Sequence, residues 1–227
     1  MQLESHRVIG RRMSYLLVAV LLLFVYLLQE VENSFPGMDI VFAILILATI
    51  YVAGSERKWL AIAVLLAIPT LALSAISSAN DWPPDTLTFI YLGFITAFVA
   101  FATFAVIREV LLADRVTVHT ISGAMVVYLL IGLAWALLYI IAEGRHPGSF
   151  SFTADSTLEA GESADLLGSL TYFSLITLTS AGYGDIIPLS DTARTLATLE
   201  AVLGQIFLAV LVAWLVGKYL SHAEEGS

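Results

Sequence analysis

Six long apolar runs constrain this chain more than any other feature of its sequence. Each is close to the roughly 20 mainly apolar residues that a helix needs to cross the hydrocarbon core of a bilayer. Of the 227 residues, 59% are hydrophobic and only 13% are charged, whereas about 25% are charged in a typical soluble domain. The chain is therefore predicted to be an integral membrane protein. The runs cover residues 13–31, 38–54, 59–76, 87–107, 121–141 and 196–220.

A seventh apolar segment, residues 166–179, is too short to cross a bilayer. It also contains five hydroxyl side chains, which are Ser169, Thr171, Ser174, Thr177 and Thr179. This pattern indicates a re-entrant helix that enters the membrane and stops. The expected fold class is all-α, with six transmembrane helices plus one re-entrant helix followed by a loop.

Basic residues predict how the chain is oriented in the membrane. With six spans, the side that holds both termini has eight basic residues, and the opposite side has only Arg145 and Arg194. Positively charged loops remain in the cytoplasm, so we expect a multi-pass protein of the cell membrane, in contact with lipids and with both termini cytoplasmic. The eight are Arg7, Arg11, Arg12, Arg57, Lys58, Arg108, Arg115 and Lys218.

Charge and cysteine content exclude several other classes. The net charge is −9 and the basic residues are scattered, which argues against a nucleic-acid partner. There is no cysteine, so neither disulfides nor thiolate metal sites can form. The basic residues before the first run allow a signal-peptide interpretation, but residues 29–32 lack small residues for cleavage. We therefore expect a retained first helix.

The stretch "LITLTSAGYGDIIP", residues 175–188, places two glycines and an aspartate between apolar segments. Non-helical backbone at membrane depth occurs only where it is buried in protein or lines a water-filled cavity. Gly182 and Gly184 can adopt positive φ without steric cost, which lets successive carbonyl groups point the same way. Such a column of carbonyl oxygens replaces the hydration shell of a potassium ion. The C-terminal dipole of the preceding helix also favours a cation.

The segment "TLTSAGYGD" resembles the pore-loop signature of tetrameric potassium channels, whose usual core is Thr-Val-Gly-Tyr-Gly-Asp. In this alignment Ser180 takes the place of the threonine and Ala181 that of the valine. The remaining positions match directly and are Gly182, Tyr183, Gly184 and Asp185. The resemblance implies that K⁺, as permeant ion and without any cofactor, is held at Ser180, Ala181, Gly182 and Tyr183. We call residues 180–185 the filter segment.

The resemblance covers about half of the chain and implies a division into two modules. Residues 1–115 form a four-helix membrane module, and residues 116–227 form the pore module. One pore loop per chain implies four subunits around a central pore, hence a homotetramer. Within the pore module we expect an outer helix at 118–143, an outer loop at 144–164, a pore helix at 165–179, the filter segment at 180–185 and an inner helix at 193–220.

Four residues are predicted to support the filter segment: Thr179 directly before it, Asp185 at its end, Tyr172 in the re-entrant helix and Glu200 in the inner helix. The bacterial prototype of the family has a glutamate nine residues before the filter aspartate, where this chain has Ile176. Asp185 therefore needs another partner, and Tyr172 is the candidate.

The inner helix holds two of the candidate residues, Glu200 and Gly204. Glu200, an ionisable group inside a span, is expected to hydrogen-bond to hydroxyl groups of the re-entrant helix. The alternatives are a protonated contact with a neighbouring helix and direct contact with ions. Gly204 stands where the family often has a glycine midway along the inner helix. It is either a gating hinge, because glycine weakens a helix by about 1 kcal/mol, or a site of close helix packing.

Two departures from the family pattern leave a second function open. Ser180 lacks the methyl group that restricts threonine, and Ala181 lacks a β-branched side chain that would pack behind the filter. A looser filter would conduct sodium as well, so a non-selective monovalent cation channel is the alternative. The fourth run contains no basic residue, which predicts at most weak voltage dependence because voltage sensors move several arginines through the field.

Other classes fit less well. Gly182 to Asp185 also matches the Gly-x-Gly-Asp pattern of intramembrane aspartyl proteases, but their chemistry needs a second aspartate at membrane depth. The other aspartates of this chain lie in loops or at span ends. An enzyme is therefore not expected. Potassium transporters built from repeated pore-loop units carry four units in one chain, and this chain has one.

Overall fold

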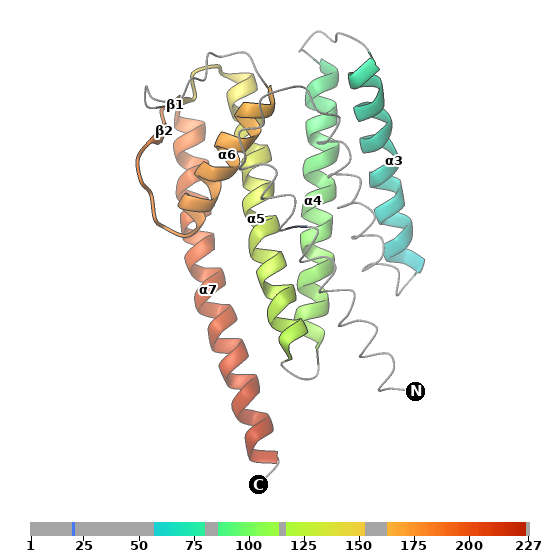
Figure 1. Ribbon diagram of the computed structural model, residues 1–227, viewed down its shortest axis with the longest axis vertical. Coiled ribbons are helices and arrows are strands. Elements are labelled where there is room, and N and C mark those ends of the chain that lie inside the picture. The colour runs from blue at the N-terminus through green and yellow to red at the C-terminus, as the bar shows by residue number, and fades with distance from the viewer. Residues whose placement is uncertain (1–19, 21–56, 80–85, 114–116, 153–162, 226–227) are drawn as a thin grey trace. The chain divides into compact units, whose positions relative to one another are not determined.

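The computed structural model describes residue 20 and residues 57–79, 86–113, 117–152 and 163–225. Apart from Val20, the first two expected spans, 13–31 and 38–54, lie outside these residues. The regular elements of the described residues are helices and two short strands (Figure 1). The elements are α3 (Arg57–Ala79), α4 (Thr86–Leu112), α5 (Val118–Arg145), β1 (Phe150–Phe152), α6 (Ser163–Leu178), β2 (Ile186–Pro188) and α7 (Asp191–Glu225).

Three described helical sections are long and apolar enough to cross a membrane. The sections are Leu87–Leu112, His119–Arg145 and Asp191–Trp214. The apolar sections Lys58–Leu73 of α3 and Leu166–Leu178 of α6 are shorter. The expectation of an all-helical membrane protein is thus confirmed in outline. The count of six spans and the orientation of the termini remain predictions.

The chain divides into two compact units, which are described separately. The described helices of the first unit are α3, α4 and the part of α5 up to Ile131, and the second unit contains α5 from Gly132 together with β1, α6, β2 and α7. The predicted division into modules of residues 1–115 and 116–227 remains a prediction.

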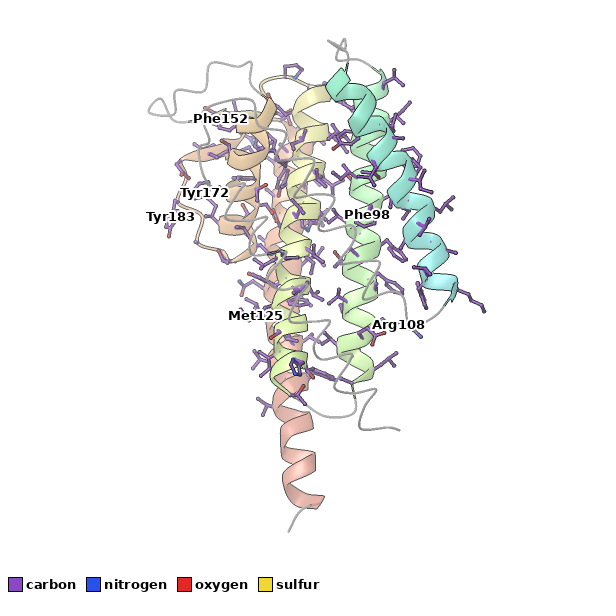
Figure 2. The ribbon with its side chains drawn as sticks, turned by 45° about the vertical axis from the view of Figure 1, so that its right-hand side comes forward. Phe98, Arg108, Met125, Phe152, Tyr172 and Tyr183 are labelled. Carbon is purple, nitrogen blue, oxygen red and sulfur yellow. The ribbon has the colours of Figure 1, made fainter. Side chains whose placement is uncertain are left out.

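In the first unit, α3 packs along α4 (Figure 1). Ala67 of α3 and Phe98 of α4 are both buried in their contact. The indole ring of Trp59 lies 6.1 Å from the ring of Phe101 and 5.6 Å from that of Phe104, measured between centroids. The guanidinium carbon of Arg108 lies 5.1 Å from the Trp59 ring, a cation–π arrangement. Figure 2 shows Phe98 and Arg108 on α4.

The second unit has an aromatic core. The rings of Tyr139, Phe150 and Phe173, from α5, β1 and α6, contact one another edge to face with centroids 5.2 to 5.4 Å apart. Such edge-to-face contacts add to the stabilisation that burial provides. The first turn of α7 is closed by Ser190, whose hydroxyl oxygen accepts a hydrogen bond from the backbone N–H of Ala193 at 3.1 Å, as in an N-cap.

The strands β1 and β2 form an antiparallel ribbon that was not predicted from the sequence. Phe150 lies opposite Pro188, and Phe152 lies opposite Ile186. The residues expected to form only an outer loop, 144–164, therefore include a strand. The reason is local, because aromatic and β-branched side chains favour paired strands and Phe150 and Ile186 are both buried in the core of the second unit.

Candidate functional site

The filter segment leads from the end of α6 at Leu178 to the start of β2 at Ile186. Residues 180–184 are exposed in the single chain, and the side chain of Tyr183 is 74% exposed. Figure 2 shows Tyr183 at the outer side of this segment, away from the helices. The segment is therefore a strip of backbone supported on one side and open on the other.

Ser180 lies two residues beyond the end of α6, at the C′ position of that helix. Its φ is 58°, in the left-handed region, and its N–H donates to the carbonyl oxygen of Thr177 at 2.9 Å. The N–H of Ala181 donates to the carbonyl oxygen of Ile176 at 2.8 Å. These two bonds with one left-handed residue define a Schellman motif, which usually places glycine at the position of Ser180. The start of the filter segment is thus also the C-terminal cap of its helix.

Positive φ then recurs at every second residue. It is found at Ser180, at Gly182 with 51° and at Gly184 with 80°, but not at Ala181 or Tyr183. Backbone of alternating hand directs successive N–H groups to one side and the carbonyl groups to the other. A Cβ built on Gly182 or Gly184 would meet no atom within 4 Å. These glycines are therefore required by backbone conformation rather than by lack of space.

Gln205 of α7 holds the side chain of Ser180. Its amide nitrogen Nε2 donates to the hydroxyl oxygen of Ser180 at 2.8 Å. Gln205 was not predicted from the sequence. The signal for it was available, because a primary amide in an apolar span needs a polar partner.

Asp185 lies at the other end of the filter segment and contacts Tyr172, as expected. The hydroxyl group of Tyr172 donates to Oδ2 of Asp185 at 2.6 Å, and the Oδ1 atom accepts the N–H of Ile186 at 3.1 Å. The hydrogen bond to Asp185 is the main cause that raises the pKa of Tyr172 to about 12. This contact joins α6 to the end of the filter segment, and its role in supporting a filter stays a prediction.

Glu200 is fully buried and connects three helices. Its Oε1 atom lies 2.5 Å from the hydroxyl oxygen of Ser174 in α6, and its Oε2 atom accepts a hydrogen bond from the hydroxyl group of Tyr139 in α5. The hydroxyl oxygen of Ser174 also lies 2.7 Å from the carbonyl oxygen of Gly132. The expected contact with a hydroxyl group of the re-entrant helix is therefore present. Tyr139 was not predicted, because a tyrosine inside a span gives no sign of its partner.

Hydrogen counting adds a detail to this network. Ser174 has a single hydroxyl hydrogen, which can be donated either to Glu200 or to the carbonyl oxygen of Gly132. All the contacts are hydrogen bonds only when the Glu200 carboxyl group itself carries a hydrogen and donates it to Ser174. A neutral carboxyl group is also the form that is least costly to bury.

Gly204 lies against the end of α6. A Cβ built on it would collide with the carbonyl oxygen of Leu178 and would lie 3.0 Å from the Cδ1 atom of the same residue. The closer atom belongs to the backbone, so a side chain at position 204 would require the two helices to separate. This geometry accounts for the glycine by close packing, while its role as a gating hinge stays a prediction.

The structure thus brings the predicted residues together at two places. Ser180 and Gly204 lie at the end of α6 that starts the filter segment, and Tyr172 and Asp185 meet at the other end. Thr179 points elsewhere, because its hydroxyl group donates to the carbonyl oxygen of Leu175 within its own helix at 2.7 Å. The Thr179 hydroxyl group therefore bonds its own helix, and its role in supporting the filter segment stays a prediction.

Comparison with known proteins agrees with this geometry. The sequence model of a family described as "Ion channel" matches residues 126–221. Protein LctB of Geobacillus stearothermophilus is 38% identical over 80 residues, covering 35% of this chain and 58% of the relative. The inward rectifier potassium channel Kirbac3.1 of Paramagnetospirillum magnetotacticum is 30% identical over 96 residues, covering 40% of this chain and 27% of the relative. Two-pore potassium channel 4 of Arabidopsis thaliana is 28% identical over 111 residues, covering 49% of this chain and 37% of the relative.

No solved structure matches the chain. The matched region spans between about a quarter and three fifths of the lengths of these relatives. The apolar helices α5 and α7 lie largely within the residues that match the ion-channel model, so the structure and the family match point to the same class of membrane protein. Over residues 126–221 the chain is similar to ion channels, and two of these relatives are named as potassium channels.

Proposed function

We propose that this chain forms a potassium-selective channel that conducts K⁺ passively through the filter segment. The observation that carries the proposal is the alternation of positive φ at Ser180, Gly182 and Gly184 in an exposed strip. Carbonyl groups directed to one side are the ligands that replace the hydration shell of K⁺. The ion sites are assigned to the backbone of Ser180, Ala181, Gly182 and Tyr183.

The proposed assembly is a homotetramer. A single strip of carbonyl groups is open on one side and cannot surround an ion, so several copies must meet around a common axis. The described part of α7 supports this, because much of its apolar surface is exposed in the single chain. Exposed apolar residues of α7 include Leu199, Val202, Leu203, Ile206 and Val210.

The proposed location is the cell membrane, with lipids around the helices and both termini in the cytoplasm. Arg57 and Lys58 begin α3, and Arg108 lies near the end of α4. If both helices cross the membrane, these basic residues flank the same side, which the positive-inside bias assigns to the cytoplasm.

A non-selective monovalent cation channel of the same architecture is the second candidate. The hydrogen bond from Gln205 favours it, because the amide nitrogen occupies one lone pair of the Ser180 hydroxyl oxygen. We expect the Ser180 hydroxyl oxygen to complete the innermost ion site beside the backbone carbonyl groups, and this hydrogen bond leaves it less available for that role. The small side chain of Ala181 also provides less packing behind the strip than a valine.

The first test is ion flux through the purified full chain in liposomes, with K⁺ and Na⁺ gradients measured separately. A selective filter predicts a K⁺ flux at least about tenfold above the Na⁺ flux, which corresponds to about 1.4 kcal/mol between the two ions. Equal fluxes would support the second candidate, and no flux of either ion would contradict both.

A pair of glycine variants identifies the pathway. Gly182→Ala places a Cβ at positive φ, at a cost of about 1 to 2 kcal/mol, and is expected to abolish selective flux. Gly93→Ala is the matched control, because Gly93 lies within α4 and a Cβ there would also meet no atom within 4 Å. Selective flux that survives in Gly182→Ala would place the pathway elsewhere.

A further inference from the structure

We propose that Glu143 is a positioning residue for the outer end of the filter segment, acting through the β1·β2 ribbon. The inference deepens the proposed function and rests on it. It assigns to one carboxyl group at the end of α5 a role in ion selectivity, although that group contacts neither the filter segment nor the ion.

Glu143 holds the turn that follows α5. Its Oε1 atom accepts the N–H of Gly148 at 2.7 Å, and its Oε2 atom accepts the N–H of Phe150, the first residue of β1, at 3.1 Å. Both oxygens of one carboxylate therefore fix one short turn. Hydrogen bonds from backbone N–H groups to an ionised carboxylate are about twice as strong as neutral ones.

The same turn is bonded to the chain that follows the filter segment. The carbonyl oxygen of Ser149 accepts the N–H of Leu189 at 2.7 Å and that of Ser190 at 3.3 Å. Beside these bonds, β1 pairs with β2 in the register that sets Phe152 opposite Ile186. Together, the turn and β1 are therefore paired through the backbone with the continuous segment 186–190.

The ribbon begins immediately after the filter segment. Ile186, the first residue of β2, directly follows Asp185 and is buried in the same core cluster as Phe150. Side-chain packing and backbone pairing therefore join β1 to the point where the strip of carbonyl groups ends. A shift of β1 moves Ile186 and, with it, Asp185.

Helix electrostatics do not explain the placement of Glu143. It lies near the C-terminal end of α5, where the negative end of the helix dipole disfavours a carboxylate. The basic Arg145 in the last turn is the residue type that this position favours. The carboxylate of Glu143 is explained instead by the hydrogen bonds that it accepts from two backbone N–H groups. Through these bonds it holds the turn and the ribbon.

The test compares K⁺ and Na⁺ fluxes of the full chain in liposomes for wild type, Glu143→Ala and Glu143→Gln. The alanine variant loses both acceptors, and we expect its K⁺-to-Na⁺ flux ratio to fall roughly tenfold, the factor expected for a charge-assisted pair. The glutamine variant keeps one acceptor oxygen and should lie between. Asp191→Asn is the matched control, because it removes one exposed charge from the first turn of α7 and should leave the ratio unchanged.

A second variant reaches the same turn without touching Glu143. Gly148 has a φ of 85°, and a Cβ there would meet no atom within 4 Å, so Gly148→Ala strains only the backbone of the turn. We expect it to lower the flux ratio as well. This variant decides the question if Glu143→Ala fails to fold.

The outcomes separate the inference from the proposed function. A wild-type protein without K⁺-selective flux would defeat the proposed function and this inference with it. A selective wild type with unchanged ratios in folded Glu143→Ala or in Gly148→Ala would overturn the inference alone. Equal losses in Glu143→Ala and Asp191→Asn would also overturn it, because surface charge rather than position would then be the cause.

Discussion

The two units of the chain can be compared through hydrogen bonds that stay within one helix and hydrogen bonds that join two helices. In the first unit, the hydroxyl groups of Thr70, Thr96 and Thr103 donate to carbonyl oxygens four residues earlier in the same helix, at 2.8, 2.6 and 2.8 Å. In the second unit, the hydrogen bonds of Tyr139 and Ser174 with Glu200 pass from one helix to another.

The two kinds of bond differ in what they do for helix register. A threonine that bonds its own helix adds no preference for one position of the neighbouring helix. A bond between helices in apolar surroundings is costly to leave unmade, so it allows only one arrangement. The second unit, which contains the filter segment, is therefore expected to be the more sensitive to single substitutions.

Glu200→Ala is expected to have the largest effect. It removes the partner of the buried Tyr139 hydroxyl group and leaves a cavity, which together cost about 3 kcal/mol. Chemical unfolding of the protein in detergent measures this loss, and the flux assay should show that K⁺ selectivity is lost with it.

Glu200→Gln is the matched comparison and should remain close to wild type. Its amide oxygen can accept from Tyr139, and its amide nitrogen can donate to Ser174, which then donates to Gly132. If the glutamine variant were as unstable as the alanine variant, the hydrogen-bond account of this network would be wrong.

Tyr172→Phe is expected to have an intermediate effect, about 1 kcal/mol, because it removes one hydrogen bond to Asp185 at a half-buried position. Since the folded-state pKa of Tyr172 is raised to about 12 from an ordinary value of about 10, its contribution is complete below about pH 10. The contribution is lost as the pH rises through about 12. Unfolding of wild type and variant over this range should converge, and a constant difference would contradict the assignment.

Trp59→Leu in the first unit should have the smallest effect. It removes the contact with Arg108, worth about 0.5 to 1 kcal/mol, but keeps an apolar side chain against Phe101 and Phe104. We expect a small loss of stability and an unchanged K⁺-to-Na⁺ flux ratio. A change of selectivity as large as that of Glu200→Ala would remove the contrast between the units.

The sequence predicted the features that follow from composition and local conformation. Long apolar runs predicted α4, α5 and α7, and the two glycines predicted non-helical backbone with positive φ between α6 and α7. The Tyr172 contact with Asp185 followed from the missing family glutamate. These inferences need only residues close in sequence or a family pattern.

The missed features depend on contacts between distant segments. Tyr139 meets Glu200 across 61 positions of sequence, and β1 pairs with β2 although both are only three residues long. Such short strands leave almost no periodic signal, and partner choice depends on the packing of the helices. The left-handed conformation of Ser180 was not predicted, because glycine is the residue that usually indicates such a helix C-cap and serine does not.

The contact of Gly204 with α6 has a consequence for how this protein can change over generations. Most tight contacts can be relieved by a smaller side chain on the partner, so that two positions drift together. Here the obstructing atom is the backbone oxygen of Leu178, which every amino acid at that position would carry. Position 204 therefore has no compensating partner, and descendants of this chain are expected to retain its glycine whatever residue they place at 178.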